Sequence, residues 1–418
     1  MSQLIIRILI IFGIFLLIDI YTFQAVKAAF NNRVWSNYFY WGLTALVLFY
    51  MIYALTTFDR AAGPNKVVNV FMGIMILTYV PKLFVVIFLF SEDLIRLLQG
   101  SITWLADFLN ISNSSPDRTQ YIPSRRAFVS QVGLALAAIP LSSIIYGMWK
   151  GKYDYRVIRQ VLHFDDLPDA FDGFTIAQIS DIHSGSFDNK EKIEYGIDLL
   201  NDQNPDLVLF TGDLVNNKAE EMEPWISSFS RLRSKHGKYS ILGNHDYGDY
   251  ISWPSAQAKA DNMERLYAVH EELGFNLMRN ENTHIEHNGE RIALLGVENW
   301  GKPPFPQHGD LKKAMNGVDA DAFKILMSHD PSHFDEEVKH QKEKIHLTLS
   351  GHTHGMQFGI EIPGLVKWSP VKYRYPKWAG LYEDLGRYLY VNRGFGYLAF
   401  PGRVGIWPEI TLIELRKA

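Results

Sequence analysis

The feature that most constrains the fold is a run of 25 residues without a charged side chain, at positions 34–58. A helix of this length crosses a hydrocarbon core of about 30 Å. Inside such a core, every backbone N–H and C=O group must be paired, which a helix does within its own segment. The stretch VWSNYFYWGLTALVLFYMIYALTTF therefore predicts a membrane-spanning helix.

Three further apolar segments lie in the first 150 residues, so we expect four spans, near 4–21, 37–57, 68–90 and 128–148. The first segment has 11 uncharged residues between Arg7 and Asp19, which fits either a signal anchor or a cleaved signal peptide. The third contains Lys82 beside Pro81. A lysine inside a span is either a functional residue or one that faces the helix bundle or reaches toward the interface.

Lys and Arg flank the spans on both sides, so their distribution does not decide the orientation. The stretch SRRAFVSQVGLALAAIP resembles a twin-arginine export signal, with Ser124, Arg125, Arg126 and Phe128 in order before an apolar helix. This resemblance implies cytoplasmic arginines and an extracytoplasmic chain after Trp149. The alternative is an ordinary basic flank of a membrane helix.

The rest of the chain has a different composition, because all 14 histidines lie after residue 160. The absence of cysteine excludes disulfides, thiolate metal sites and cysteine nucleophiles. A net charge of -4 gives no sign of a nucleic-acid partner. We expect a transmembrane helical region at residues 1–150 and a catalytic domain at 151–418.

From Phe174 onward, short apolar runs alternate with helical stretches. The predicted strands are FTIAQIS, PDLVLFTG, KYSILG, RIALLGV, FKILMS and IHLTLS, and the predicted helices are 190–204 and 253–273. This alternation indicates an α/β fold with mainly parallel central strands. In such folds, ligand-binding groups collect beyond the carboxyl ends of the strands.

Five of the predicted strands are followed by His, Asp or Asn side chains. These are Asp181 and His183, then Asp213, then Asn244, His245 and Asp246, then His329 and Asp330, then His352 and His354. Each motif alone is weak, because a D-x-H triplet is usually incidental and a single Asp at a strand end more often caps a turn. Together, carboxylates and imidazoles crowded at one sheet edge are costly to desolvate unless a cation compensates them. We therefore expect a metal site.

The number of donors indicates two ions, because about seven oxygen and nitrogen ligands exceed the four of one tetrahedral zinc site. Mixed His, Asp and Asn ligation suits Mn, Fe or Zn, and suits Mg less well. Two such ions about 3.5–4 Å apart clamp a phosphoryl group and lower the pKa of a bound water. The expected reaction is hydrolysis of a phosphoester.

The motifs DIH, GD, GNHD, SHDP and GHTH, in this order and spacing, resemble those of the calcineurin-like metallophosphoesterase superfamily over about residues 160–418. The stretches SDIHSG, LMRNEN, GVENW and YVNRGFG are similar to those of membrane-associated or exported bacterial phosphoesterases of the YkuE type. The resemblance implies an α/β fold in which a two-sheet sandwich is flanked by helices and preceded by an α-helical transmembrane region.

The resemblance also implies a role for each site residue. Asp181, His183 and His354 would hold one metal ion; Asn244, His329 and His352 would hold the other; and Asp213 would bridge both. The attacking group would be a metal-bound hydroxide. His245, not a ligand, would stabilise the transition state or protonate the leaving oxygen, and Asp246 would orient it.

One departure from the superfamily bears on the substrate. Its protein Ser/Thr phosphatases continue the Asp motif as GDxVDRG, whereas this chain reads GDLVNNK from Gly212. The Asp and Arg that help to bind protein phosphate are missing. A phosphoprotein substrate is therefore disfavoured.

We expect a membrane-anchored phosphoesterase that hydrolyses a phosphodiester or pyrophosphate bond in a lipid or envelope precursor, in the cytoplasmic (inner) membrane of a bacterium. The alternatives are an anchored general or nucleotide phosphodiesterase, a UDP-diacylglucosamine pyrophosphohydrolase, and a non-catalytic phosphate-binding sensor or transporter. Residues 366–400 interleave basic and aromatic side chains. This stretch forms either a surface among lipid headgroups or a β-rich cap whose aromatic side chains are core.

Overall fold

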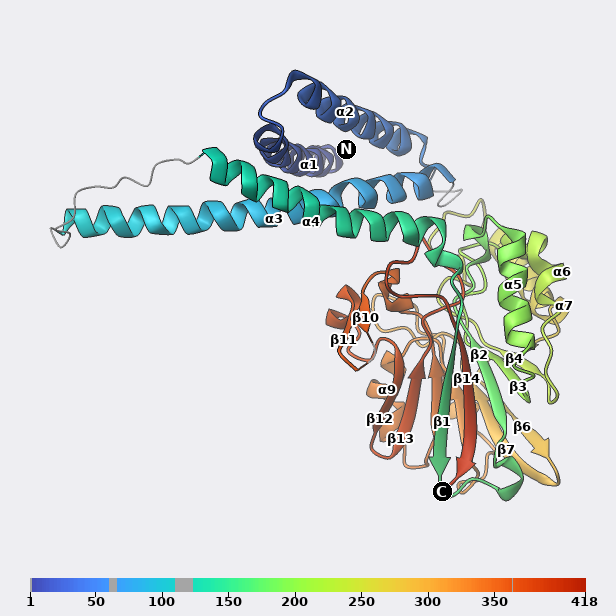
Figure 1. Ribbon diagram of the computed structural model, residues 1–418. Helices are drawn as coiled ribbons and strands as arrows, with labels where there is room; N and C mark the ends of the chain where they lie inside the picture. Colours follow the sequence, from blue (N-terminus) through green and yellow to red (C-terminus); the bar gives the residue numbers. More distant parts are fainter. Residues whose placement is uncertain (1, 60–65, 110–122, 363) are drawn as a thin grey trace. The chain divides into compact units, whose positions relative to one another are not determined.

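The computed structural model describes residues 2–59, 66–109, 123–362 and 364–418 (Figure 1). The chain divides into two compact units. One comprises Met1–Phe58 and Lys66–Ile145, and the other contains Tyr146–Ala418. We call the first the membrane unit and the second the catalytic unit.

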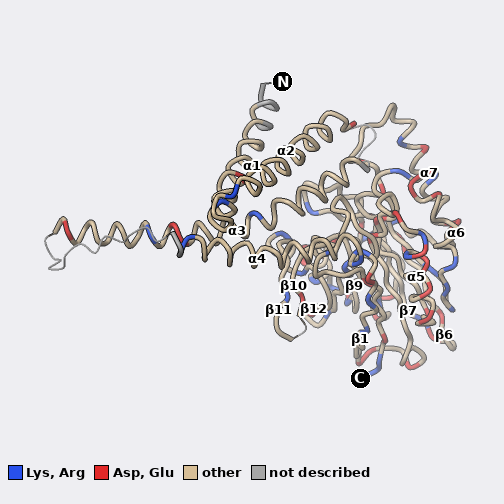
Figure 2. Tube along the Cα trace, turned by 45° about the horizontal axis from the view of Figure 1, so that its top comes forward, with Lys and Arg blue, Asp and Glu red and all other residues tan. Residues whose placement is uncertain are grey.

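The membrane unit consists of long apolar helices, as the sequence predicts. They are α1 (Ser2–Ala29), α2 (Val34–Thr57), α3 (Lys66–Phe108) and α4 (Pro123–Trp149), and all four are long and apolar enough to cross a membrane. The last turn of α4, from Tyr146, belongs to the catalytic unit. Charged residues are sparse along them and frequent in the rest of the chain (Figure 2). The expectation of four apolar helices is confirmed.

Two of these helices are longer than the predicted spans. α1 continues to Ala29, and α3 has 43 residues, about 64 Å at the rise of an α-helix and twice the hydrocarbon thickness. Glu92 and Asp93 follow the apolar part of α3 at once. The helix continues because no proline interrupts residues 91–108, but this part is too polar to lie wholly in hydrocarbon.

Lys82 faces the interior of the membrane unit. Its Nζ lies 2.5 Å from Oδ1 of Asp19, a fully buried residue of α1. The Tyr79 hydroxyl donates to the other Asp19 oxygen at 3.1 Å, and the Tyr40 hydroxyl donates to the Asp19 carbonyl at 2.8 Å. A buried charge pair of this kind fixes the packing of α1 against α3, so α1 is an integral part of the unit.

Arg126, the second arginine of the twin-arginine stretch, is also held by ion pairs within this unit. Its Nη1 lies 2.6 Å from Glu92 and 2.7 Å from Asp93. These ion pairs tie the start of α4 to α3.

The catalytic unit is built on two six-stranded sheets and one two-stranded hairpin. The first sheet has the order β1 (Arg156–Phe164), β14 (Glu409–Lys417), β2 (Thr175–Ile179), β3 (Leu207–Phe210), β4 (Lys238–Ser240), β5 (Asn276–Leu277). The second has the order β12 (Gly380–Asp384), β13 (Arg387–Val391), β9 (Leu347–Ser350), β8 (Lys324–Met327), β7 (Glu290–Gly296), β6 (Glu281–His287). The hairpin is β10 (Ile360–Ile362) with β11 (Val366–Trp368).

The central strands are parallel, as expected. β2 to β5 run parallel in the first sheet, and β7, β8, β9 and β13 run parallel in the second. The helices are α5 (Lys190–Asn201), α6 (Ile226–Phe229), α7 (Ala256–Glu272), α8 (Leu311–Ala314) and α9 (Ser332–Glu336). The α/β two-sheet architecture with flanking helices is confirmed.

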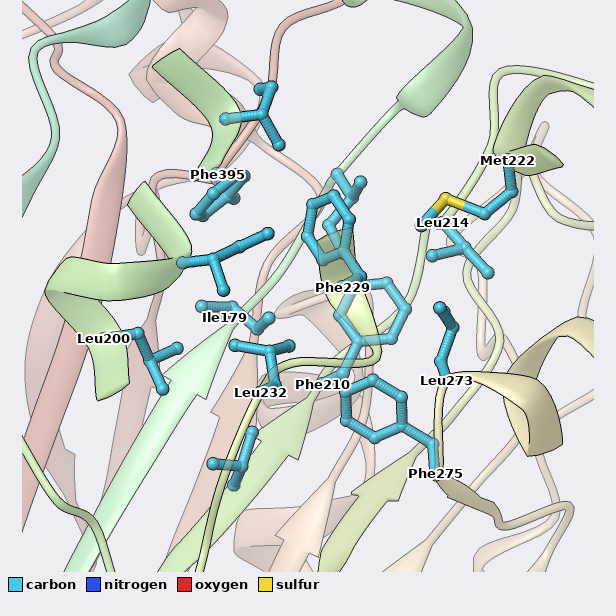
Figure 3. Close-up of a cluster of buried hydrophobic side chains, with 14 of the residues drawn as sticks. Ile179, Leu200, Phe210, Leu214, Met222, Phe229, Leu232, Leu273, Phe275 and Phe395 are labelled. Atoms are coloured by element: carbon cyan, nitrogen blue, oxygen red, sulfur yellow. The ribbon is translucent and has the colours of Figure 1, made fainter. Parts of the chain in front are cut away.

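Apolar side chains explain why the layers stack. Strand residues alternate between the two faces of a sheet, and one face of each sheet packs against the other sheet, with Ile176 and Leu209 in the same cluster as Met327 and Leu349. The other face of the first sheet packs against α5, α6 and α7 (Figure 3). The other face of the second sheet packs against α8 and α9. Both sheets are therefore covered, and their strand ends are held at fixed positions.

Candidate metal centre

The candidate metal ligands lie at the carboxyl ends of parallel strands from both sheets. Asp181 and His183 follow β2, Asp213 follows β3, Asn244 follows β4, His329 follows β8, and His352 and His354 follow β9. Because the two sheets are stacked, the loops after these five strands meet at one end of the sandwich. All seven candidate ligands are brought together there.

The first group consists of Asp181, His183 and His354, with one ligand atom of each within 4.8 Å of the others. The two Nε2 atoms of His183 and His354 are 3.0 Å apart, and Nε2 of His354 lies 3.1 Å from Oδ1 of Asp181. These side chains are buried. Two imidazole nitrogens this close require a proton or a cation between them.

The second group consists of Asp213, His329 and His352, again within 4.8 Å of one another. Oδ2 of Asp213 is 3.1 Å from Nε2 of His329 and 3.5 Å from Nε2 of His183 in the first group. The carboxylate of Asp213 thus lies between the two groups. Asn244 adjoins the second group, with its Oδ1 2.8 Å from Nδ1 of His352.

The backbone at this centre is held in an unfavourable conformation. Asp181, His183, Asp213, His352 and His354 all have φ between 49° and 70°. Residues with a side chain rarely adopt this left-handed region, and such strain persists only where the surrounding fold imposes it. Strain at five of the seven candidate ligands is typical of a functional site.

The charges and contacts of these residues fit metal ions. Burial opposes protonation of His329, but the carboxylates of Asp213 and Asp181 outweigh it and raise the pKa of His329 to about 10. A buried group that retains a proton so strongly marks a centre that requires positive charge. In addition, Nδ1 of His329 donates to the Thr211 carbonyl at 2.7 Å, the contact that commonly orients a metal-ligating histidine.

His245 lies beside the first group but is a member of neither group. Its ring centroid is 5.0 Å from that of His183 and 4.5 Å from that of Tyr250. Its backbone N–H donates to Oδ1 of Asp213, and its Nδ1 donates to the Asn216 carbonyl, both at 2.8 Å. These two bonds fix the ring and leave Nε2 as the atom available to a ligand. Burial lowers the pKa of His245.

The structure gives Asp246 a role different from the one expected. The sequence predicts that Asp246 orients His245, but the carboxylate accepts backbone N–H groups from Asp213, Leu214 and Gly243 at 2.8–2.9 Å. The Asn216 carbonyl orients His245 instead. The reason is that the turn after β3 leaves its N–H groups unpaired, and the buried carboxylate satisfies them. Burial and the Asp213 carboxylate raise the pKa of Asp246 to about 7.

Three contacts at the centre come from residues that the sequence does not single out. The hydroxyl of Tyr375 lies 2.8 Å from Nε2 of His352. Nη2 of the fully buried Arg403 lies 3.3 Å from Nδ1 of His354. Glu221 accepts the N–H of Asn216 at 2.6 Å and so supports the carbonyl that holds His245. The aromatic and basic composition of residues 366–400 is the only signal that points toward Tyr375.

Two family models match the chain. Residues 3–152 match the model described as "Probable Calcineurin-like phosphoesterase, transmembrane domain", and residues 174–356 match the one described as "Calcineurin-like phosphoesterase". A protein of Danio rerio named "Transmembrane protein with metallophosphoesterase domain" is 26% identical over 76% of this chain and 69% of its own length. The "Uncharacterized metallophosphoesterase YkuE" of Bacillus subtilis (strain 168) is 29% identical over 70% of this chain and 98% of its own length.

Proposed function

We propose that this membrane-associated metallophosphoesterase hydrolyses a phosphodiester or pyrophosphate bond in a lipid-linked substrate. The support is that the chain joins a transmembrane domain to a calcineurin-like phosphoesterase domain. The resemblance seen in the five sequence motifs is confirmed by these matches, and so is the phosphoesterase class. The substrate, the metal count and the orientation in the membrane are proposed on the grounds that follow.

We propose that two divalent ions, of Mn, Fe or Zn, bind at the centre. Asp181, His183 and His354 would hold one ion, Asn244, His329 and His352 would hold the other, and Asp213 lies where it would serve both. Bound there, divalent ions polarise a phosphoryl oxygen and lower the pKa of a bound water. The position of the Asp213 carboxylate, 3.1 Å and 3.5 Å from imidazoles of the two groups, supports two ions rather than one.

The protein's own groups then bind, orient and protonate the substrate. His245 holds its proton on Nδ1 against the Asn216 carbonyl, so Nε2 faces the centre and exchanges a proton there. In the protonated state, Nε2 donates to a phosphoryl oxygen or to the departing oxygen. Asp246 keeps the turn that carries Asp213 in place through its three short backbone contacts.

One observation supports a substrate at the membrane. Arg403 contacts the candidate ligand His354 through its side chain, and its backbone N–H donates to the Gly147 carbonyl at 3.2 Å. Gly147 belongs to the last turn of α4, a candidate membrane span that ends at Trp149. One residue, Arg403, therefore contacts both a candidate ligand and the C-terminal turn of a candidate span. A substrate whose phosphate lies in the headgroup layer reaches such a centre directly.

We further propose that the enzyme resides in the cytoplasmic membrane of a bacterium with its catalytic unit on the extracytoplasmic side. Four spans place the N-terminus and the catalytic unit on the same side of the membrane. The order Ser124, Arg125, Arg126 and Phe128 at the start of α4 supports a cytoplasmic location for that end. Nothing in the charge distribution supports a nucleic-acid substrate.

The test compares substrates on the purified full-length protein loaded with Mn²⁺. Hydrolysis of bis-p-nitrophenyl phosphate is measured against p-nitrophenyl phosphate, and then against phosphodiester and pyrophosphate lipids in mixed micelles at varied surface concentration. We expect diester cleavage to exceed monoester cleavage and lipid turnover to follow surface concentration. Equal kcat/KM for soluble and micellar substrates would favour a general or nucleotide phosphodiesterase. Release of UMP from UDP-diacylglucosamine would identify that lipid as a substrate.

The matched variant is His245→Ala, which removes the proton-carrying imidazole and leaves all seven candidate ligands in place. We expect it to lose activity on every substrate. Persistence of the biological function in this variant would favour a phosphate-binding sensor or transporter.

A further inference from the structure

Exposed apolar side chains of the catalytic unit gather around the hairpin β10–β11. They are Met356 (59% exposed), Ile360 (52%), Ile362 (48%), Leu365 (76%), Val366 (39%) and Tyr373 (78%). Elsewhere in the part of the unit that the structure describes, exposed large apolar residues such as Val161, Tyr195 and Leu385 lie singly along the chain. Clustered exposure of this kind marks an interaction site, whereas scattered exposure does not.

The hairpin exposes apolar side chains on one face and bonds the polar side chains of its other face to the domain, which is the reverse of an ordinary surface strand pair. Side chains alternate along each strand, so Ile360 and Ile362 lie on the same face of the hairpin. Val366 lies on this face too, because it pairs with Ile362 across the hairpin. Ile360, Ile362 and Val366 are exposed on this face, and Trp368, which pairs with Ile360 on the same face, is partly buried. A soluble protein normally buries the apolar face and exposes the polar one.

The polar face is bonded to the domain. Glu361 forms a two-point ion pair with Arg393, with oxygen–nitrogen distances of 2.5 and 2.9 Å. Nζ of Lys367 donates to the Ala379 carbonyl at 2.5 Å. These contacts are specific and charge-assisted, so they hold the apolar face outward. The exposure is built into the fold and is not the result of a loosely packed loop.

The base of the hairpin is tied to the end of a candidate membrane span. Gln357 O accepts the N–H of Val404 at 2.8 Å, and Gly359 N–H donates to Val404 O at 2.9 Å. The preceding residue, Arg403, donates to Gly147 of α4. The packing is tight, because a Cβ at position 147 would lie 2.5 Å from the Arg403 carbonyl oxygen. The base of the hairpin is therefore linked, through Val404 and Arg403, to the C-terminal turn of α4.

The end of α4 and the segment after the hairpin carry residue types that are common at a membrane interface. Trp149, the last residue of α4, is 81% exposed. Exposed Lys372, Tyr373 and Arg374 follow the hairpin. Tryptophan and tyrosine favour the headgroup layer, and Lys and Arg attract its anionic phosphates.

We propose that the apolar face of β10–β11 inserts into the interfacial layer of the bilayer that α4 leaves, with Lys372 and Arg374 among the lipid phosphates. The hairpin starts six residues after His354, and the same stretch of chain carries Tyr375, which contacts His352. Insertion therefore fixes the metal-binding loop at the membrane surface. The inference concerns docking of the catalytic unit and holds whichever phosphoester bond is cut.

The test uses the absence of cysteine in the natural chain. Leu365→Cys places a unique thiol on the hairpin, and Leu385→Cys places a matched thiol on the turn between β12 and β13, where the native leucine is 64% exposed. Each full-length variant is labelled with an environment-sensitive fluorophore. Each is then placed, one chain per disc, in nanodiscs of phosphatidylethanolamine and phosphatidylglycerol with and without spin-labelled quencher lipids.

We expect severalfold stronger quenching by the lipids, and weaker quenching by aqueous iodide, for the Leu365 label than for the Leu385 label. Equal quenching of the two labels would overturn the proposal. So would a shift of the Leu365 label that appears only at two chains per disc, since this would assign the face to a second copy of the chain. Both sites are exposed leucines, so neither variant removes a core contact.

Discussion

His270 is a histidine that the folded protein keeps neutral. It is fully buried on α7, with its Nδ1 2.9 Å from the Ser240 hydroxyl, and burial lowers its pKa from 6.5 to about 3. Between these two values, the unfolded chain binds a proton that the folded chain excludes. Above pH 6.5 neither state binds this proton, so His270 does not reduce the free energy of unfolding. As the pH falls from 6.5 toward 3, protonation of the unfolded chain progressively reduces that free energy. At pH 5 the loss from this one group is about 2 kcal/mol.

The assay is thermal unfolding of the full-length protein in detergent at pH 7.5 and pH 5, for wild type, His270→Gln and His163→Gln. His163 is exposed on β1 and serves as the control. When the pH falls from 7.5 to 5, the Tm of wild type should decrease by about 4–8 °C more than the Tm of His270→Gln. The decrease for His163→Gln should equal that of wild type. Comparing variants cancels the other groups that titrate in this range. If wild type and His270→Gln lose the same Tm, the argument from His270 is wrong.

Three further variants test individual contacts. Asp246→Asn should lower the free energy of unfolding by roughly 2–6 kcal/mol, because an amide nitrogen leaves two buried backbone N–H groups unpaired; an unchanged Tm would refute this. Lys82→Met should cost about 3–5 kcal/mol by leaving Asp19 buried without a cation, and adding Asp19→Asn should recover most of it. If the double variant is no more stable than Lys82→Met in thermal unfolding, the pair is not coupled. Tyr375→Phe should weaken Mn²⁺ binding roughly 10-fold or more in calorimetry by releasing the His352 ring; equal affinity would contradict that role.

Periodicity and composition predict much of the fold. The uncharged runs predict the four membrane helices, and the alternation of apolar runs predicts β2, β3, β4, β7, β8 and β9 close to their observed bounds. α5 begins at the predicted residue, after the N-cap Asn189, but ends at Asn201, before the predicted end; α7 begins at Ala256, later than predicted, because Ser255 caps it through the N–H of Ala258. Pairing of β1 with β14 joins segments about 250 residues apart. No local sequence pattern predicts a contact between such distant segments.

The candidate site likewise has some residues that the sequence predicts and others that it does not. The candidate ligands are predictable because each follows a strand, and the order of parallel strands brings them to one edge. The Asn216 carbonyl that holds His245 is not predictable, because any residue can supply a backbone oxygen. Arg403 reaches His354 only through packing of the loop that precedes β14, which depends on the complete fold. The inverted faces of β10–β11 are visible only once the partners of Glu361 and Lys367 are known.

The most direct test of the central claim measures bound Mn²⁺ per chain and hydrolysis of bis-p-nitrophenyl phosphate on the same preparation, for wild type, Asp213→Asn and His245→Ala. We predict two ions per chain and metal-dependent diester cleavage in wild type. Asp213→Asn should lose both ion binding and cleavage, and His245→Ala should keep both ions and lose cleavage. A single bound ion in fully active wild type, or full cleavage by either variant, would contradict a two-ion phosphoesterase in which His245 carries the proton.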